Sequence, residues 1–265
     1  MNAFRIFIFV IFARTLLSFQ LDSLLHDDVK PTELLRQFGI GNDRASLAKG
    51  LVHKESVVRR AALSVISERL ERSLTPNVMV LLDARDRSTQ VAAASTLIDL
   101  GNAKMKDTLY AALRDDSVIV RIEAARFLCV HKDPAGESVI ANSIHDTDIN
   151  LRVIAVEAAG RCLPSGRILD LLLAVMKTDE SPDIRLQALL EVESVHSQEV
   201  VQALIDSLED KNSYVRFGAS EALQRVTNHR IPFAHNGPPD GRKQAILSWK
   251  VWLRANRGVL QERKQ

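Results

Sequence analysis

Residues 181–192 of the chain are SPDIRLQALLEV. A polar start is followed by an aliphatic residue and an arginine, and apolar residues then recur three and four positions apart, which is typical of an amphipathic helix. Five other stretches have the same form, with glutamine in place of the arginine in the second of them: ESVVRRAALSVI at 55–66, STQVAAASTLIDLG at 88–101, SVIVRIEAARFL at 117–128, DINLRVIAVEAAG at 148–160 and NSYVRFGASEAL at 212–223. The chain therefore contains an internal repeat.

One residue in each repeat, called here the signature residue, sets the period. The six signature residues are Arg59, Gln90, Arg121, Arg152, Arg185 and Arg216, and successive ones are 31, 31, 31, 33 and 31 positions apart. Apolar stretches between them, such as ILDLLLAVM from Ile168, predict a second amphipathic helix in each repeat. Each repeat is thus predicted to be two antiparallel helices, A and then B, with the signature residue in the first turn of helix B. One such pair cannot bury its apolar face alone, so the pairs must stack.

The aliphatic residue, the arginine and the small residue three positions after it resemble the HEAT repeat. The short period is similar to that of a bacterial HEAT-like family that includes phycobilisome lyase subunits, and the resemblance covers residues 43–227. It implies an all-α fold, a right-handed α-solenoid of about six to seven helical hairpins with a C-terminal capping helix. Residues 21–42, in which Pro31 marks a helix start, are expected to form a degenerate capping repeat.

The N-terminal segment, residues 1–20, differs from the repeats. It contains an uninterrupted apolar run from Ile6 to Ala13 between two arginines, and no clean small-x-small cleavage site follows it. A transmembrane helix needs about twenty apolar residues, whereas the apolar part of a signal peptide needs roughly seven to fifteen. We favour an export signal or short membrane anchor in residues 4–19 over an apolar helix packed on the repeats or a translation-start artefact. An exported, periplasmic or membrane-anchored location is correspondingly favoured over the cytoplasm.

The C-terminal segment, residues 228–265, consists of a Pro/Gly-rich loop, a helix from Lys243 and a basic tail. Trp249 and Trp252 lie three residues apart on this helix. We predict a capping helix whose tryptophans cover the apolar end of the stack, in preference to an aromatic pair that binds a ligand.

The charge distribution argues against a nucleic-acid partner. The chain has a net charge of +2, but residues 228–265 carry eight Lys or Arg against two acidic residues, and residues 1–20 carry two arginines. The repeat body from 21 to 227 therefore has a net charge of −6. A repeat protein that binds nucleic acid needs its basic residues along the body, where they neutralise phosphates.

The signature arginines are predicted to be structural. Carboxylates precede each of them by a few positions, namely Glu55, Asp115 and Asp116, Asp148, Asp179 and Asp183, and Asp210. A stripe of arginines can bind phosphates, but in stacked helices such arginines and carboxylates form a ladder that also satisfies backbone carbonyls between helices. We therefore assign Arg59, Arg121, Arg152, Arg185 and Arg216 to a structural ladder.

No motif for catalysis, a metal or a cofactor is found. The sequence lacks HExxH, a phosphate-binding loop and a nucleophile elbow. The HEAT-repeat enzyme deoxyhypusine hydroxylase uses His-Glu pairs as iron ligands, and this sequence has no His-Glu dipeptide. Cys129 and Cys162 show neither metal-ligand spacing nor a disulfide framework, so we predict two buried thiols. We expect a protein that is not an enzyme.

The predicted function is that of a non-catalytic scaffold or assembly factor that binds a protein or peptide partner in a groove lined by B helices. Candidate groove residues are polar positions of the B helices turned away from helix A: Arg60, Glu123, Glu157, Gln187 and Glu221. Four of the five are acidic or neutral, which favours a basic partner segment. The alternative is a lyase-like accessory subunit for cofactor attachment or maturation of another protein. Either way, we expect a monomer or a member of a hetero-complex.

Overall fold

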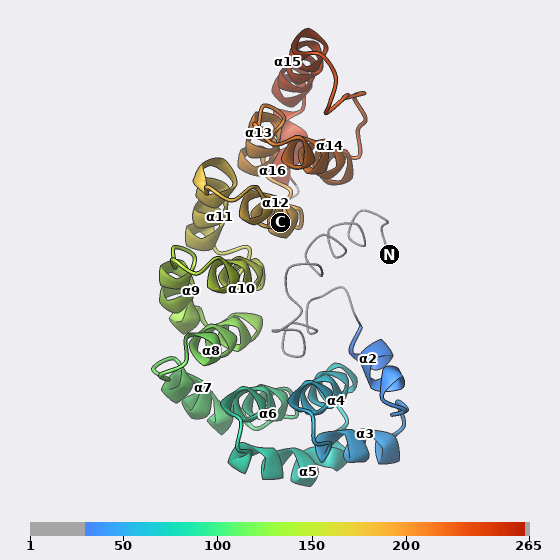
Figure 1. The fold of residues 1–265 in the computed structure, drawn as a ribbon, viewed down its shortest axis with the longest axis vertical. Helices are drawn as coiled ribbons and strands as arrows, with labels where there is room; N and C mark the ends of the chain where they lie inside the picture. The colour runs from blue at the N-terminus through green and yellow to red at the C-terminus, as the bar shows by residue number, and fades with distance from the viewer. Residues whose placement is uncertain (1–29, 263–265) are drawn as a thin grey trace. The chain divides into compact units, whose positions relative to one another are not determined.

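The computed structural model describes residues 30–262, and all regular structure in this range is helical (Figure 1). The described residues belong to two compact units, one ending at Asp116 and the other beginning at Ser117. The expectations for residues 1–20 and for the start of the capping repeat lie outside the described range. Within that range, no helix has the length and apolar character needed to cross a membrane.

The first unit contains two complete helix pairs. Its α-helices are α2 (Pro31–Gln37), α3 (Arg44–Leu51), α4 (Ser56–Arg69), α5 (Thr75–Val80), α6 (Arg87–Asp99) and α7 (Lys106–Ala112), with short 3₁₀ turns at Arg72–Leu74, Leu81–Asp83 and Ala103–Met105. The B helices α4 and α6 pack side by side, and α2 packs on α4 where a preceding B helix would lie. Leu34 and Leu35 of α2 are buried in this contact.

The second unit continues the pattern. Its α-helices are α8 (Val118–Val130), α9 (Glu137–Ser143), α10 (Ile149–Gly160), α11 (Gly166–Thr178), α12 (Pro182–Val192), α13 (Gln198–Ser207), α14 (Ser213–Thr227), α15 (Pro239–Ala255) and α16 (Arg257–Glu262), with a 3₁₀ turn at Pro134–Gly136. Helices α8, α10, α12 and α14 form a row of B helices, and α9, α11, α13 and α15 form a row of A helices (Figure 1). The predicted α-solenoid of paired helices is confirmed.

Two features of the repeat explain why B helices form and stack. Side-chain oxygens of short polar residues cap the N-termini of several helices, accepting hydrogen bonds from backbone N–H groups; on B helices these caps are Asp86, Ser117, Asp148 and Asn212. The residue three positions after each signature residue is alanine and is completely buried: Ala62, Ala93, Ala124, Ala155, Ala188 and Ala219. A side chain this small lets neighbouring B helices approach closely.

Arg185 shows how a signature arginine joins two repeats. Its Nη1 donates to the backbone carbonyls of Asp179 and Glu180, at 2.8 and 3.2 Å, in the loop that precedes its own helix. Its Nε and Nη2 donate to the two carboxylate oxygens of Asp210, at 2.7 and 2.8 Å, in the corresponding loop of the next repeat. One buried guanidinium therefore closes its own hairpin and binds the following one in a bidentate pair.

The same two contacts recur along the chain. Arg59, Arg152 and Arg216 each donate through Nη1 to the carbonyls six and five positions upstream, at 2.8–3.3 Å. Arg59 also binds the carboxylate of Asp86, and Nε of Arg152 lies 3.3 Å from the carboxylate of Asp179. Arg121, on α8, is half-buried. The contacts of the ladder therefore recur once per repeat, because the signature arginine and its partner loops recur with the repeat.

Burial and nearby groups shift the pKa values of the ladder residues Asp86 and Arg216. Burial raises the pKa of Asp86, but hydrogen bonds from Thr89 and Arg59 outweigh it, so the pKa lies below its usual value. Asp86 therefore stabilises the fold above its unfolded-state pKa, and this contribution is lost as the pH falls. Burial, followed by the nearby charge of Arg242, lowers the pKa of Arg216, while Asp210 opposes the shift.

In the repeat where the signature residue is Gln90, two side chains divide the work. The Gln90 amide donates to the carbonyl of Ala84, six positions upstream, at 2.6 Å. Arg87, one turn earlier on α6, supplies the cation and donates through Nε to Asp115 at 2.9 Å. Nη1 of Arg87 also donates a hydrogen bond to the side-chain amide oxygen of Gln90. Both ladder contacts are therefore kept without an arginine at the signature position.

The last ladder arginine ends on the C-terminal loop. Nε of Arg216 donates to the backbone carbonyl of His235 at 2.8 Å, where the earlier arginines meet a carboxylate. The His235 ring contacts Phe217 edge-on, with 5.0 Å between ring centroids. This loop thus closes the row of B helices at α14.

The prediction of two buried thiols is wrong, because Cys129 and Cys162 form a disulfide. Both residues are buried, and their Cα atoms lie 4.7 Å apart. They are separated by 33 residues, about one repeat. Cys129 lies in the last turn of α8, and Cys162 lies just after the end of the adjacent B helix α10. In stacked repeats, positions one period apart are neighbours, so a single pair of cysteines suffices for a bridge.

Replacing Arg185 by methionine tests the ladder. The change keeps the helix propensity but leaves the carboxylate of Asp210 buried without its cation, so we expect the free energy of unfolding to fall by about 3 kcal/mol. Urea denaturation followed by circular dichroism measures the change. The matched control is Arg36→Met, because the Arg36 side chain is 79% exposed in its ion pair with Glu33, and a loss below about 0.5 kcal/mol is expected there. Equal losses in both variants would contradict the ladder.

Reducing the disulfide should weaken the second unit. Opening a bridge that closes a loop of 33 residues is expected to cost about 3 kcal/mol. Denaturation with and without dithiothreitol measures this loss, and the double variant Cys129→Ala, Cys162→Ala serves as a control that no longer responds to the reductant. Alkylation of both cysteines in unreduced, natively produced protein would show that the bridge does not form.

Candidate functional site

The exposed side of the B helices is defined by three positions of the repeat. In the second unit, the residues two, five and nine positions after the signature residue are half-buried or exposed, except Gly218. These positions are three and four residues apart and so lie along one side of each helix. The B-helix surface, as the name is used below, consists of Glu123, Arg126, Val130, Ile154, Glu157, Arg161, Gln187, Leu190, Ser194, Glu221 and Arg225.

Four of the five predicted groove residues lie on the B-helix surface. Glu123, Glu157, Gln187 and Glu221 come from the four successive helices α8, α10, α12 and α14, and each is half-buried. Arg60 is different: it is only 7% exposed and follows the signature residue directly, on the packed side of α4. The assignment of Arg60 to an exposed groove is therefore corrected.

The B-helix surface carries both signs of charge. Glu123, Glu157 and Glu221 are acidic, but Arg126, Arg161 and Arg225 occupy the same side of the helices. The Arg225 guanidinium binds the Glu193 carboxylate of the preceding repeat through Nε and Nη2, at 2.8 and 2.5 Å. This hydrogen bonding raises the pKa of Arg225. The preference for a basic partner, drawn from the acidic positions alone, therefore loses its basis.

Near the centre of this surface, the Glu191 side chain lies directly against Gly160. A Cβ atom on Gly160 would lie 1.9 Å from a carboxylate oxygen of Glu191 on the next B helix. That carboxylate accepts a hydrogen bond of 2.7 Å from Gln187. Gly160 thus makes room for a side chain that crosses from one repeat to the next.

The two tryptophans of α15 have different surroundings. Trp249 is 1% exposed and packs toward the stack together with Ala245 and Ile246. Trp252 is half-buried, and its ring stacks on His229 with 5.4 Å between ring centroids and 15° between ring planes. His229 also meets Trp249 edge-on at 5.7 Å. Trp249 is therefore the residue that fills the end of the stack, whereas Trp252 faces outward.

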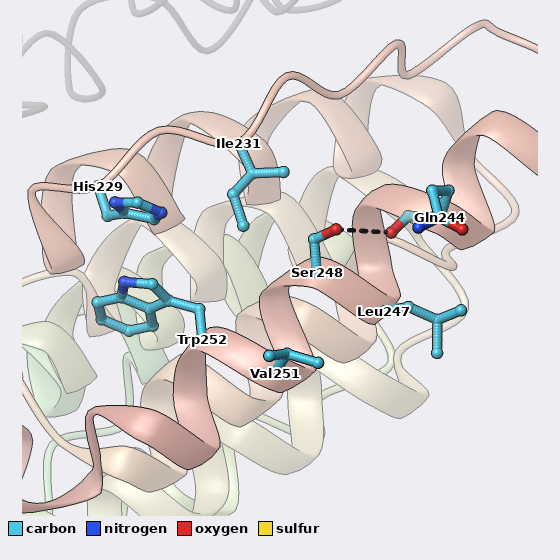
Figure 2. Close-up of a pocket in the computed structure, with 7 residues that line it drawn as sticks. All are labelled: His229, Ile231, Gln244, Leu247, Ser248, Val251 and Trp252. Atoms are coloured by element: carbon cyan, nitrogen blue, oxygen red, sulfur yellow. Dashed lines mark hydrogen bonds between the residues drawn. The ribbon is translucent and has the colours of Figure 1, made fainter.

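An apolar hollow lies on this outward side. It has a volume of about 420 Å³ and is lined by His229, Ile231, Gln244, Leu247, Ser248, Val251 and Trp252. Figure 2 shows its walls, which are the loop segment 229–231 on one side and one face of α15 on the other. The Ser248 hydroxyl donates a hydrogen bond to the backbone carbonyl of Gln244. We call this surface the terminal hollow.

A second hollow of about 410 Å³ lies at the ladder between the fourth and fifth repeats, lined by Ile144, His145, Asp146, Thr147, Arg152, Val175, Thr178, Asp179 and Glu180. Arg152 and Asp179 are ladder partners there, so its charged groups have structural roles. Across residues 30–262, no group of three or more His, Cys, Asp or Glu side chains is placed to hold a metal ion.

Sequence patterns missed the terminal hollow because its walls come from two separate segments. The spacing of Leu247 and Val251, four residues apart, was an available signal of a second apolar side on α15. The position of His229 against Trp252 depends on how the 228–238 loop returns along the helix, and no pattern in the sequence specifies that path.

Comparison with known proteins supports the repeat assignment. The family model for HEAT repeats matches residues 169–233, which include helices α12 and α13. The chain is similar to an uncharacterised phycocyanin operon protein Z of Pseudanabaena tenuis, at 26% identity over 187 residues that cover 66% of this chain and 91% of the relative. The prediction of HEAT-like repeats is confirmed.

Solved structures that are similar to the chain include the following three. An engineered protein matches with a TM-score of 0.42 and 16% identity, covering 69% of this chain and 95% of the other. The Escherichia coli protein YibA matches with a TM-score of 0.45 and 19% identity, covering 77% and 79%. A designed armadillo repeat protein matches with a TM-score of 0.41 and 16% identity, covering 69% and 100%.

Proposed function

We propose that this HEAT-repeat protein is a non-catalytic scaffold that binds a protein partner on the B-helix surface of its second unit. The observation that carries the proposal is that each of four neighbouring B helices places two half-buried or exposed polar residues among the three positions that define this surface. Because the ladder fixes the spacing between these helices, the side chains form a regular array. An extended array of this kind suits a long partner segment better than a small molecule.

The charges of the array favour a partner with both signs. Acidic side chains at Glu123, Glu157 and Glu221 alternate with arginines on the same helices. A partner segment of a single sign would meet like charges as well as opposite ones, which lowers its affinity. We therefore replace the basic segment inferred from the sequence by one in which basic and acidic residues alternate.

A second candidate is an accessory role in the attachment of a cofactor to another protein, or in that protein's maturation. The observation that favours it is the similarity to a relative named for the phycocyanin operon. Under this hypothesis the partner on the B-helix surface is a phycocyanin subunit. Binding of purified phycocyanin subunits to the immobilised chain distinguishes the two candidates. The accessory role requires this binding, whereas the general scaffold hypothesis does not.

We propose further that the protein acts in an oxidising compartment outside the cytoplasm. Two observations support this location: the apolar run between Arg5 and Arg14, and the Cys129–Cys162 disulfide. Disulfides persist in the periplasm and outside the cell, whereas cytosolic thiol systems keep cysteines reduced. The apolar run is long enough for a signal peptide and short for a transmembrane span.

Charge reversal tests the B-helix surface. The triple variant Glu123→Lys, Glu157→Lys, Glu221→Lys is expected to retain the fold and to lower partner recovery about tenfold in a quantitative pull-down, because each partner cation would face a like charge. The matched control reverses three exposed acidic residues of the A-helix side, Asp170, Glu199 and Glu209, and should leave recovery unchanged. If all specific partners survive the first triple variant, the B-helix surface is not the binding site.

N-terminal sequencing with cell fractionation tests the location. We expect the mature protein outside the cytoplasm, either lacking its first residues or held at the membrane by residues 4–19. Deleting residues 4–19 should leave the protein in the cytoplasm with Cys129 and Cys162 reduced, as measured by thiol alkylation. An intact Met1 on soluble cytoplasmic protein would rule out export.

A further inference from the structure

Helix α15 ends the row of A helices with an apolar side still exposed. Within the row, α11 packs against α13 and α13 against α15, so each of these helices is covered by the next. On α15 the outward side chains Leu247 and Val251 are 56% and 62% exposed. The helices at the ends of a repeat stack normally carry a polar outer side, which keeps the stack soluble and closed. This end does not.

The exposed apolar side chains form one continuous surface. Leu247 and Val251 stand one helical turn apart, and together with Ile231 and Trp252 they line the terminal hollow (Figure 2). Single exposed apolar residues are common on protein surfaces, whereas a hollow lined by two exposed and two half-buried apolar side chains is a candidate binding site. The Trp252 ring is held in place by its stacking on His229, which also lines the hollow.

A row of cations borders this surface. Lys243, Lys250 and Arg254 lie three and four positions from Leu247 and Val251, which places them along one edge of the apolar side of α15. Between residues 228 and 257 there are six Lys or Arg and a single acidic residue, Asp240, so this segment has a net charge of +5. Asp240 lies 3.6 Å from Lys243 and offsets only that cation.

We propose that the terminal hollow docks an acidic amphipathic helix of a partner protein. A helix is the expected occupant because a helix covers the corresponding side of α11 and α13 in this same chain. Apolar residues on one side of the partner helix would fill the hollow, and carboxylates along its edge would meet Lys243, Lys250 and Arg254. This site is separate from the B-helix surface and does not depend on the function proposed for it.

Fluorescence anisotropy with defined peptides tests the proposal on the full chain. The probe is a labelled amphipathic peptide of about eighteen residues, with leucines at i, i+3, i+4 and i+7 and glutamates along the flanking edge. The control peptide has lysines in place of the glutamates. We expect the acidic peptide to bind at least about tenfold more tightly than the basic one, and to lose affinity as salt is added.

Two variants locate the binding. Leu247→Ser with Val251→Ser should weaken the acidic peptide about tenfold, whereas Met79→Ser with Val80→Ser, at side chains of comparable exposure (49% and 68%) on the first unit, should change its affinity less than about twofold. Lys250→Glu with Arg254→Glu should reverse the preference between the two peptides. Circular dichroism confirms that each variant is folded.

Three results would overturn the proposal. The acidic peptide fails to bind up to about 1 mM, or both peptides bind equally well, or the two serine variants have the same effect. Sedimentation velocity provides a further check. If the unliganded chain is a dimer that Leu247→Ser with Val251→Ser dissociates, a second copy of the chain covers the hollow and the partner helix is excluded.

Discussion

The arginine that joins two loops is the interaction on which the stack depends. Arg59, Arg152 and Arg185 each hold the carbonyls before their own B helix and a carboxylate before the next one. Packing of alanine-rich helices alone would allow neighbouring repeats to slide or rotate, because small apolar surfaces specify register weakly. A directional, bidentate contact repeated once per period fixes the spacing between B helices. Everything presented on their exposed side inherits that spacing.

The repeat that has Gln90 at the signature position still makes both ladder contacts, although it has no arginine at that position. The two tasks of the arginine are divided between Gln90 and Arg87, one turn apart on the same helix. The division is possible because residues three apart on a helix point to the same side. A repeat that looks degenerate in sequence is therefore intact in its contacts.

Much of the fold was predictable from sequence, because a period of about thirty residues specifies both the helix pairs and their stacking. The helix rotation was harder. Arg60 was predicted to lie on the exposed side of α4, but it is buried. Each step of one residue along a helix rotates the side chain by about 100°, so a small error in register moves a residue from the exposed side to the packed side. The disulfide was missed because cysteine spacing was compared with compact frameworks, whereas stacking makes positions one period apart adjacent. The terminal hollow required the path of the 228–238 loop, which depends on tertiary contacts such as Arg216 with His235.

The Cys129–Cys162 bridge has a consequence for how the second unit opens. Repeat proteins unfold as a one-dimensional chain of coupled units, and a disturbance that starts at one end can spread from neighbour to neighbour. The Cys129–Cys162 bond links the repeats that contain α8 and α10, so these two successive repeats must unfold together. The bridge thus acts as a barrier to fraying on the N-terminal side of the unit. The repeats on the C-terminal side of the bridge are held to one another by hydrogen bonds and packing alone, so they can unfold locally while the bridged repeats stay folded.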